Sequence, residues 1–259
     1  MNNTFNIQRF GLLLKRQWLE FGKIYLISLV VVLGVLLAFY VGSLWPYLTE
    51  QRPFYSRHLN FREPLFLIFG FMFISVIASA YFSHLGQKPK AIIDLMIPAS
   101  TFEKFLTGIF FTALLSTASF LLLFYLTDLA FVAKLRGLYK NDEAYMLYFF
   151  TKNNANQFMP IYWVPFFVTS IFLLGSIYFE KFHYIKTTIC VMIFSGIWAA
   201  IIAKSGKELF EGKIPINNDH MRHMFNTKDN AELWITLLLI VLTLVFWSIT
   251  YVRLKEKEV

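Results

Sequence analysis

Six long apolar runs dominate the sequence, and none of them has an Asp, Glu, Lys, Arg or His in its interior. Each run is about 17–23 residues long, the length that an α-helix needs to cross about 30 Å of hydrocarbon. A core helix of a soluble protein is usually shorter and carries a polar stripe, which these runs lack. We therefore expect an all-α, polytopic membrane protein with six spans. The predicted spans are 24–45, 64–82, 105–127, 159–179, 187–203 and 233–251.

The segments between the spans are too short for a separate soluble domain, since most domains need at least ~50 residues. Residues 1–259 are therefore predicted to form a single transmembrane domain. The net charge of +8 would suggest nucleic acid as a partner of a soluble protein. Here the basic residues lie between spans, where they meet lipid headgroups, so we expect membrane lipids and no nucleic acid as partners.

An even number of spans places both termini on the same side of the membrane. The 24 Lys and Arg residues divide equally between the two sides. Short loops and the first helix carry most weight in the positive-inside rule, and they favour a cytoplasmic N-terminus. We therefore expect a multi-pass protein of the cell (inner) membrane with both termini in the cytoplasm.

Residues 6–23 form an amphipathic pattern ahead of the first span. Phe10, Leu14, Trp18 and Phe21 recur at helical spacing, while the charged residues fall elsewhere on the helical wheel. Such a helix lies in the membrane interface with its basic groups among the headgroups. The alternative is a frayed basic leader.

The segment between the second and third spans has an unusual composition. Between Pro89 and Pro98 it is rich in apolar residues, yet it is too short to span a membrane. We predict a short helix there, and an irregular interfacial loop is the alternative. Its apolar residues are Ile92, Ile93, Leu95, Met96 and Ile97.

A helix start follows this stretch. Ser100 and Glu103 have the S-x-x-E spacing of a capping box, in which each residue accepts a hydrogen bond from the other's backbone N–H. Pro98 blocks fusion of the short helix with the next one. The sequence thus predicts a short helix, a stop and a fresh start of the third span.

The span interiors lack the groups that intramembrane chemistry requires. They contain no Asp, Glu or His for a catalytic pair, a metal site or a proton relay. The H-x-x-H spacing of His220 and His223 is interpreted as part of a solvated loop. The stretch from Gly206 to Lys213 departs from the phosphate-loop spacing. We therefore expect no catalytic residue, metal or cofactor in this chain.

Three polar residues near span ends have simpler interpretations. Asp128, at the end of the third span, is expected to be a solvated interfacial carboxylate. His84 and His183 flank spans on the same predicted side and suit headgroup or helix-end contacts.

These features together resemble the permease subunits of type-2 ABC transporters, which are mostly exporters. The shared features are the interfacial N-terminal helix, the six spans and the short apolar helix between spans two and three. The segment Leu95–Phe105, which reads LMIPASTFEKF, is similar to one found in small bacterial members. The family often has re-entrant helices between spans five and six, whereas residues 204–230 are too polar to enter lipid here.

The resemblance implies roles for particular segments. Residues 10–21 would be the elbow helix, and 90–97 the coupling helix that inserts into a groove of a separate ABC ATPase subunit. Two permeases, either a homodimer or a pair with a homologous permease, would work with two ATPase copies. The implied coupling-helix contacts are Lys90, Ile92, Ile93, Asp94, Leu95 and Met96.

The leading hypothesis is therefore an ATP-driven exporter subunit. Ser, Thr, Tyr and Phe in the spans suit a lipid-like, peptide or drug-like substrate. The alternatives are a non-transporting sensor or scaffold, and an ATP-independent carrier. An intramembrane enzyme lacks its catalytic groups.

Overall fold

The computed structural model describes residues 5–49, 53–86, 94, 96–139, 149, 159–210 and 218–257. All regular secondary structure in these residues is helical. The main helices are α1 (Ile7–Thr49), α2 (Arg62–Tyr81), α4 (Thr101–Ile109), α5 (Ser116–Leu138), α6 (Val164–Tyr178), α7 (His183–Phe210) and α8 (Asn218–Lys257). A π-helical segment, Phe110–Leu115, joins α4 to α5. Short 3₁₀ helices cover Ser56–Leu59, Ser83–Gly86 and Met159–Tyr162.

Five of these helices are long and apolar enough to cross a membrane. The five are formed by α1, by α2, by the continuous helix Thr101–Leu138 that includes α4 and α5, by α7 and by α8. The sixth apolar helix, α6, has only 15 residues. At about 1.5 Å per residue it is about 22 Å long, short of the hydrocarbon thickness. The chain is thus an all-helical protein with the features of a multi-pass membrane protein.

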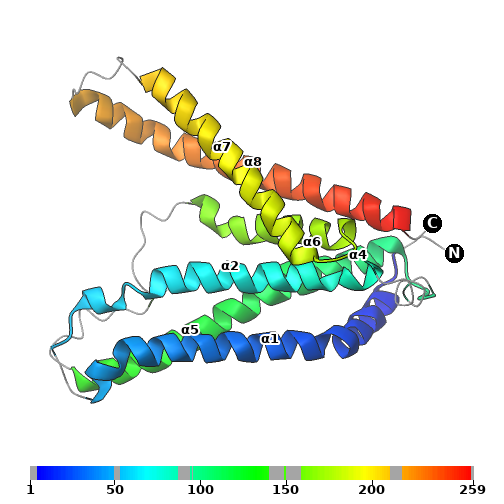
Figure 1. Cartoon of the computed structure of the whole chain (residues 1–259), viewed down its shortest axis with the longest axis horizontal. Helices are drawn as coiled ribbons and strands as arrows, with labels where there is room; N and C mark the ends of the chain where they lie inside the picture. The colour runs from blue at the N-terminus through cyan, green and yellow to red at the C-terminus, as the bar shows by residue number, and fades with distance from the viewer. Residues whose placement is uncertain are drawn as a thin grey trace.

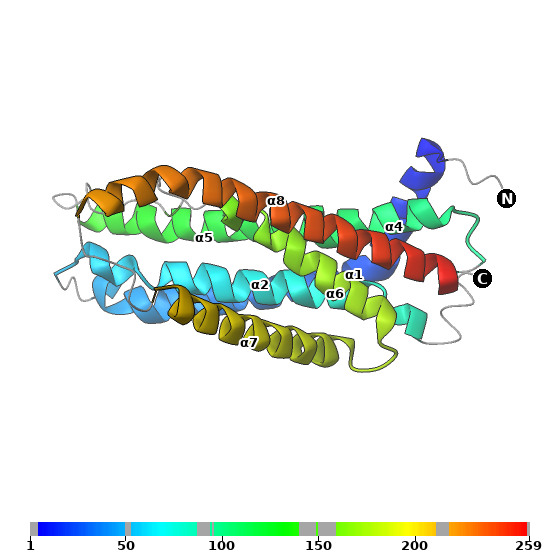
Figure 2. The ribbon, with the colours of Figure 1, turned by 90° about the horizontal axis from the view of Figure 1, so that it is seen from above.

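Successive helices run in alternating directions along one bundle, so both termini lie at the same end (Figure 1). We call this the terminal end and the opposite one the far end. The turn between α6 and α7 also lies at the terminal end. Helix α6 packs against α2, α7 and α8. Figure 2 shows α7 and α8 on opposite sides of α6.

The first helix is longer than predicted. The predicted interfacial segment 6–23 and the span 24–45 belong to one continuous helix, which also includes Pro46. No helix-breaking residue separates the two segments, and both have helical periodicity. The first turns of α1 are inclined to the rest of the helix (Figure 2). The two parts therefore differ in direction without a break in hydrogen bonding.

The predicted span 159–179 is shorter in the structure. Its first residues form the 3₁₀ helix Met159–Tyr162, and α6 begins only at Val164, with a proline in its first turn. Proline is well tolerated there because its missing N–H would have had no partner within the helix. The buried Thr169, Ser170 and Ser176 donate to carbonyl oxygens of their own helix.

Two predicted loops are partly helical. The span predicted at 105–127 continues as helix to Leu138. Much of 204–232, expected outside the membrane as a loop, extends α7 to Phe210 and begins α8 at Asn218. The polarity of these residues argues against contact with lipid, and it does not argue against a helix.

Candidate functional site

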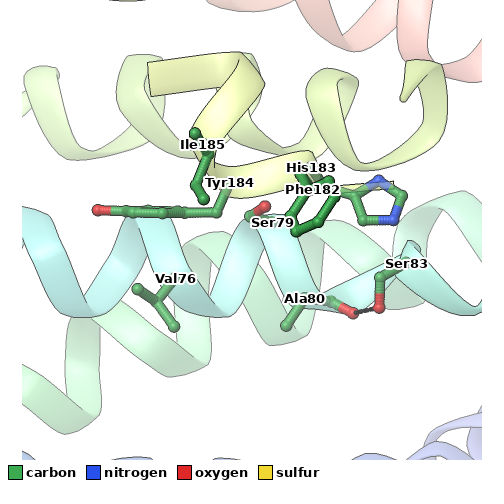
Figure 3. Close-up of a pocket in the computed structure, with 8 residues that line it drawn as sticks. All are labelled: Val76, Ser79, Ala80, Ser83, Phe182, His183, Tyr184 and Ile185. Carbon is green, nitrogen blue, oxygen red and sulfur yellow. Dashed lines mark hydrogen bonds between the residues drawn. The ribbon is translucent and has the colours of Figure 1, made fainter. Parts of the chain in front are cut away.

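An open cavity of about 430 Å³ lies between the last turns of α2 and the first turn of α7 (Figure 3). Its walls are mostly apolar. The residues that line it are Val76, Ser79, Ala80, Ser83, Phe182, His183, Tyr184 and Ile185. Of these residues, the sequence analysis named only His183. The cavity itself could not be predicted, because it joins segments that lie about 100 residues apart in the sequence.

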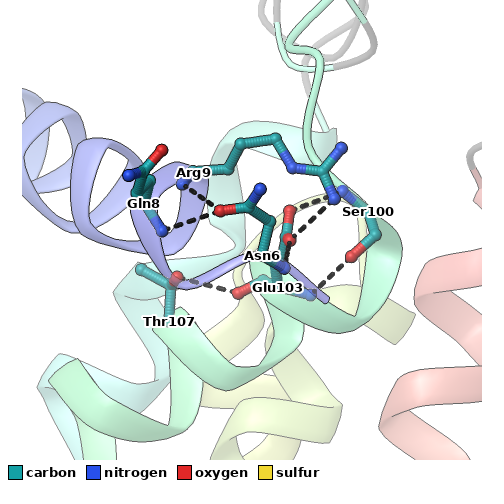
Figure 4. Close-up of polar contacts among 6 residues, drawn as sticks. All are labelled: Asn6, Gln8, Arg9, Ser100, Glu103 and Thr107. Atoms are coloured by element: carbon teal, nitrogen blue, oxygen red, sulfur yellow. Dashed lines mark hydrogen bonds and ion pairs between the residues drawn. The ribbon is translucent and has the colours of Figure 1, made fainter. Parts of the chain in front are cut away.

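A second polar site joins the start of α1 to the start of α4 (Figure 4). The capping box predicted at Ser100 and Glu103 is present: the Ser100 hydroxyl accepts from Glu103 N at 3.2 Å, and Glu103 Oε2 accepts from Ser100 N at 3.0 Å. The other carboxylate oxygen, Oε1, accepts from Asn6 N at 2.8 Å and from Arg9 Nη2 at 3.0 Å. Asn6 also caps α1, since its Oδ1 accepts from Gln8 N.

The Glu103 carboxylate is fully buried in this site, while Arg9 remains one-third exposed. A buried charge requires hydrogen bonds and a counter-ion, and Glu103 has both. Its carboxylate also lies at the N-terminal ends of two helices, where the helix dipoles favour a negative charge. The site therefore holds the two helices together at the terminal end.

The segment implied to be a coupling helix lies largely outside the described residues. Lys90, Ile92, Ile93 and Leu95 are among those not described. Of the other implied contacts, Met96 is 79% exposed. Asp94 is only partly exposed.

The end of that segment is bound to α4. Lys104 Nζ donates to the backbone oxygen of Asp94 at 2.8 Å and lies 3.5 Å from its Oδ2. Lys104 itself is buried. Polar contacts therefore connect Asp94 and the capping residue Ser100 to the first turn of α4.

The predicted elbow residues contact the bundle. Phe21 is buried against Tyr81 and Phe111, and the Trp18 ring stacks on Phe111 while remaining 41% exposed. Phe10 and Leu14 are partly buried. The C-terminal part of the predicted elbow helix, at Trp18 and Phe21, thus packs against other helices of the bundle.

A buried ion pair at the far end corrects the interpretation of Asp128. This residue is 1% exposed, where a solvated carboxylate was expected. Its Oδ1 accepts from Arg62 Nη1 at 2.8 Å and from the Tyr40 hydroxyl at 3.0 Å. Its Oδ2 accepts from Phe149 N at 2.8 Å. Tyr40 belongs to α1, Arg62 to α2 and Asp128 to α5, so these contacts join three helices. Arg62 lies outside the predicted span 64–82, but in the structure it begins α2.

The π-helical segment between α4 and α5 is another feature that the sequence did not predict. The Tyr25 hydroxyl of α1 lies 3.1 Å from the Leu115 carbonyl oxygen and 2.6 Å from the Ser119 hydroxyl. A π-helical turn inside an α-helix is rare and is frequent at functional sites. Tyr25 therefore connects α1 to the middle of the long α4–α5 helix.

The remaining predicted sites stand as follows. The described residues contain no group of three His, Cys, Asp or Glu side chains that could hold a metal ion. The side chains of His84, His220 and His223 lie outside the described part of the chain. Cys190 is a free, exposed cysteine on α7.

Comparison of the chain with protein-family models, with curated proteins and with solved structures finds no match.

Proposed function

We propose that the chain is the membrane-spanning permease subunit of an ATP-driven, ABC-type exporter of a lipid-like, peptide or drug-like substrate. A separate ATPase subunit supplies the energy, because this sequence has no complete phosphate-binding loop. The assembly has two permeases and two ATPases, in the inner membrane, with the terminal end in the cytoplasm.

The observation that carries the proposal is the linked pair of contacts after the short segment between α2 and α4. Lys104 holds Asp94 to α4, and the next residue toward the N-terminus, Glu103, holds α4 to Arg9 of α1. A force applied to residues 90–97 by a partner would therefore act on α4 and α1 together. A loop without such contacts would absorb the same displacement.

The long helix that begins at this site supports the same function. The α4–α5 helix, Thr101–Leu138, has 38 residues and a length of about 57 Å. It extends from the Glu103 site at the terminal end to the Asp128 ion pair near the far end. A displacement of its first turn is thereby transmitted across the whole bundle. This is the mechanical connection that an energised permease requires.

The surface of the segment suits a protein partner. Met96 is 79% exposed and lies beyond the predicted spans, so lipid does not cover its apolar side chain. Its neighbours Ile92, Ile93 and Leu95 are also apolar. Apolar side chains inserted into a pocket, with charged residues at the rim, are typical of the energetic centre of an interface.

Affinity co-purification of the tagged chain from mild detergent tests the proposal. We expect an ATPase subunit to accompany the native chain and to be lost from Ile93→Asp/Leu95→Asp. Tyr178→Asp is the matched control, since Tyr178 is 60% exposed at the end of α6, also at the terminal end, and does not line the cavity between α2 and α7. If no ATPase accompanies the native chain under several gentle conditions, a sensor or scaffold role replaces the transporter. If the double variant retains the ATPase, the contact lies elsewhere.

A further inference from the structure

The cavity between α2 and α7 combines an apolar wall with a polar end. Val76, Ala80 and Ile185 provide aliphatic surface, and the Phe182 and Tyr184 side chains complete the wall (Figure 3). Its volume of about 430 Å³ falls in the range of small-molecule sites, roughly 300–1,000 Å³. The cavity is open, so it can take part of a larger molecule whose remainder stays outside.

Two polar groups in this cavity make no hydrogen bond of good geometry within the described part of the chain. Ser79 is 4% exposed, and its hydroxyl makes no hydrogen bond to any residue that the structure describes. Ser75 and Ser83, on either side of it, each donate to a nearby carbonyl oxygen. The Nδ1 atom of His183 is buried without a hydrogen bond of good geometry among the described residues, while the backbone of Gly175 and Phe179 lies near enough to act on the same ring. A polar atom without a partner is costly where water cannot reach it, as at His183 Nδ1. The Ser79 hydroxyl is not among these fully buried atoms, so it is open to the cavity that it lines and can bind a polar atom of a ligand.

The charges around the polar end favour an anion. Lys186 and Lys257 both lie near enough to His183 to act on it electrostatically. Lys181 is exposed in the preceding turn, and Glu180 is the acidic group beside Lys257. Lys257 Nζ donates to the Ile177 carbonyl oxygen and Lys186 Nζ lies over the Phe179 ring, so two cations are held near this end of the cavity. The N-terminus of α7 adds positive potential at the same place.

The position of the cavity identifies the source of that anion. Helix α2 and the apolar run that it contains end beside it, at Tyr81 and Phe82. Headgroups lie at this level when the apolar run occupies the hydrocarbon. Phe182, with a φ of 54° and 71% exposure, projects from the α6–α7 turn at the same level. An aromatic ring among cations is typical of a membrane interface.

We propose that this cavity binds one anionic membrane phospholipid. One acyl chain lies along the apolar wall formed by Val76, Ala80 and Ile185. The phosphodiester accepts hydrogen bonds from the Ser79 hydroxyl, from the Nδ1–H of a neutral His183 imidazole and from the first N–H groups of α7. Lys186 and Lys257 balance its charge. The site does not depend on an ATPase partner, so it stands or falls independently of the transport function.

Native mass spectrometry of the full chain, released from nanodiscs, tests the proposal. The nanodiscs contain phosphatidylcholine alone or phosphatidylcholine with phosphatidylglycerol. We expect one retained phosphatidylglycerol per chain and its loss from Val76→Trp, because the indole fills the cavity. Ile68→Trp is the matched control: Ile68 is 61% exposed on the same helix and does not line the cavity, so this variant keeps the lipid. Equal retention by both variants overturns the proposal.

Two further comparisons keep the test decisive. Ser79→Ala removes one hydroxyl without adding bulk and weakens retention, whereas Ser75→Ala leaves it unchanged. This holds even if Val76→Trp fails to fold. Thermal melting of the chain in detergent with added phosphatidylglycerol, phosphatidylcholine or inorganic phosphate separates the sources of the anion. Stabilisation by phosphatidylglycerol alone supports the proposal, and equal stabilisation by phosphatidylcholine or by inorganic phosphate contradicts it.

Discussion

The Glu103 carboxylate and the Arg9 guanidinium form a 3.0 Å ion pair between helices whose starts are 94 residues apart in sequence. Glu103 also caps α4, so one carboxylate serves a local and a long-range contact. The start of α1 is therefore fixed to the residues that follow the short segment between α2 and α4. This arrangement explains how a partner bound to that segment would move two helices at once.

Glu103→Gln tests the strength of this connection. The amide keeps the shape of the side chain but loses its charge and one acceptor. We expect the bundle to be destabilised by about 1–3 kcal/mol, the cost of leaving a buried group unpaired. Thermal melting in detergent measures the effect. Glu20→Gln is the control, because Glu20 pairs with Arg16 on an exposed face and its loss should cost less than about 1 kcal/mol. Equal melting temperatures for the two variants would contradict this account.

Asp128→Asn tests the buried pair at the far end. The substitution leaves the buried Arg62 without its carboxylate partner, and we expect a loss of about 3–5 kcal/mol of stability. Denaturant titration in detergent provides the measurement. In Glu256→Gln, the exposed pair with Arg253 is removed instead, with an expected change of less than about 1 kcal/mol. A small effect of Asp128→Asn would mean that the site is hydrated.

Gly175→Ala tests the close approach of α6 and α7. An added methyl group would overlap the Thr187 side chain, 2.9 Å from its Cγ2 and 3.0 Å from its Cβ. Rotation of Thr187 cannot relieve the second contact, so α7 must shift. We expect a destabilisation of about 1–3 kcal/mol. Gly196→Ala, with no atom within 4 Å of the new methyl group, is the control and should melt at or slightly above the temperature of the native chain, because alanine favours a helix over glycine.

Tyr25→Phe tests the contact of α1 with the π-helical segment. The loss of the hydroxyl removes hydrogen bonds to Leu115 O and Ser119, worth about 0.5–1.5 kcal/mol. Hydrogen exchange of the amides in Phe110–Leu115 should become faster while exchange in α8 stays unchanged. Tyr178→Phe, at a 60% exposed position, serves for comparison. Unchanged exchange in the π-helical segment would show that Tyr25 does not stabilise it.

Local patterns in the sequence predicted part of this structure. The helix start at Ser100 and Glu103 depends on residues three positions apart, so its spacing is visible in the chain. The apolar runs likewise predicted the helices that are long enough to cross a membrane. Helix lengths were less predictable, because a polar helix such as the start of α8 has no apolar run to mark it.

Long-range contacts could not be predicted in this way. The burial of Asp128 depends on Arg62, 66 residues away, and its sequence position at the end of a span suggested solvent. The second role of Glu103 depends on Arg9. The pairing of Ser79 with His183 in one cavity depends on how α2 and α7 pack. A single sequence contains each of these residues but not their proximity.

Site-specific cross-linking in cells that express the chain tests the central claim most directly. The native Cys190 is exposed, so the background is Cys190→Ser. A bifunctional thiol cross-linker at Met96→Cys should capture one protein, identified by mass spectrometry as an ATPase with a complete phosphate-binding loop. Tyr178→Cys, at the same end of the bundle and outside the α2–α7 cavity, should not capture it. An ATPase captured through Met96→Cys alone is the predicted result. Capture of no ATPase there, or equal capture at both positions, would contradict the proposed coupling site.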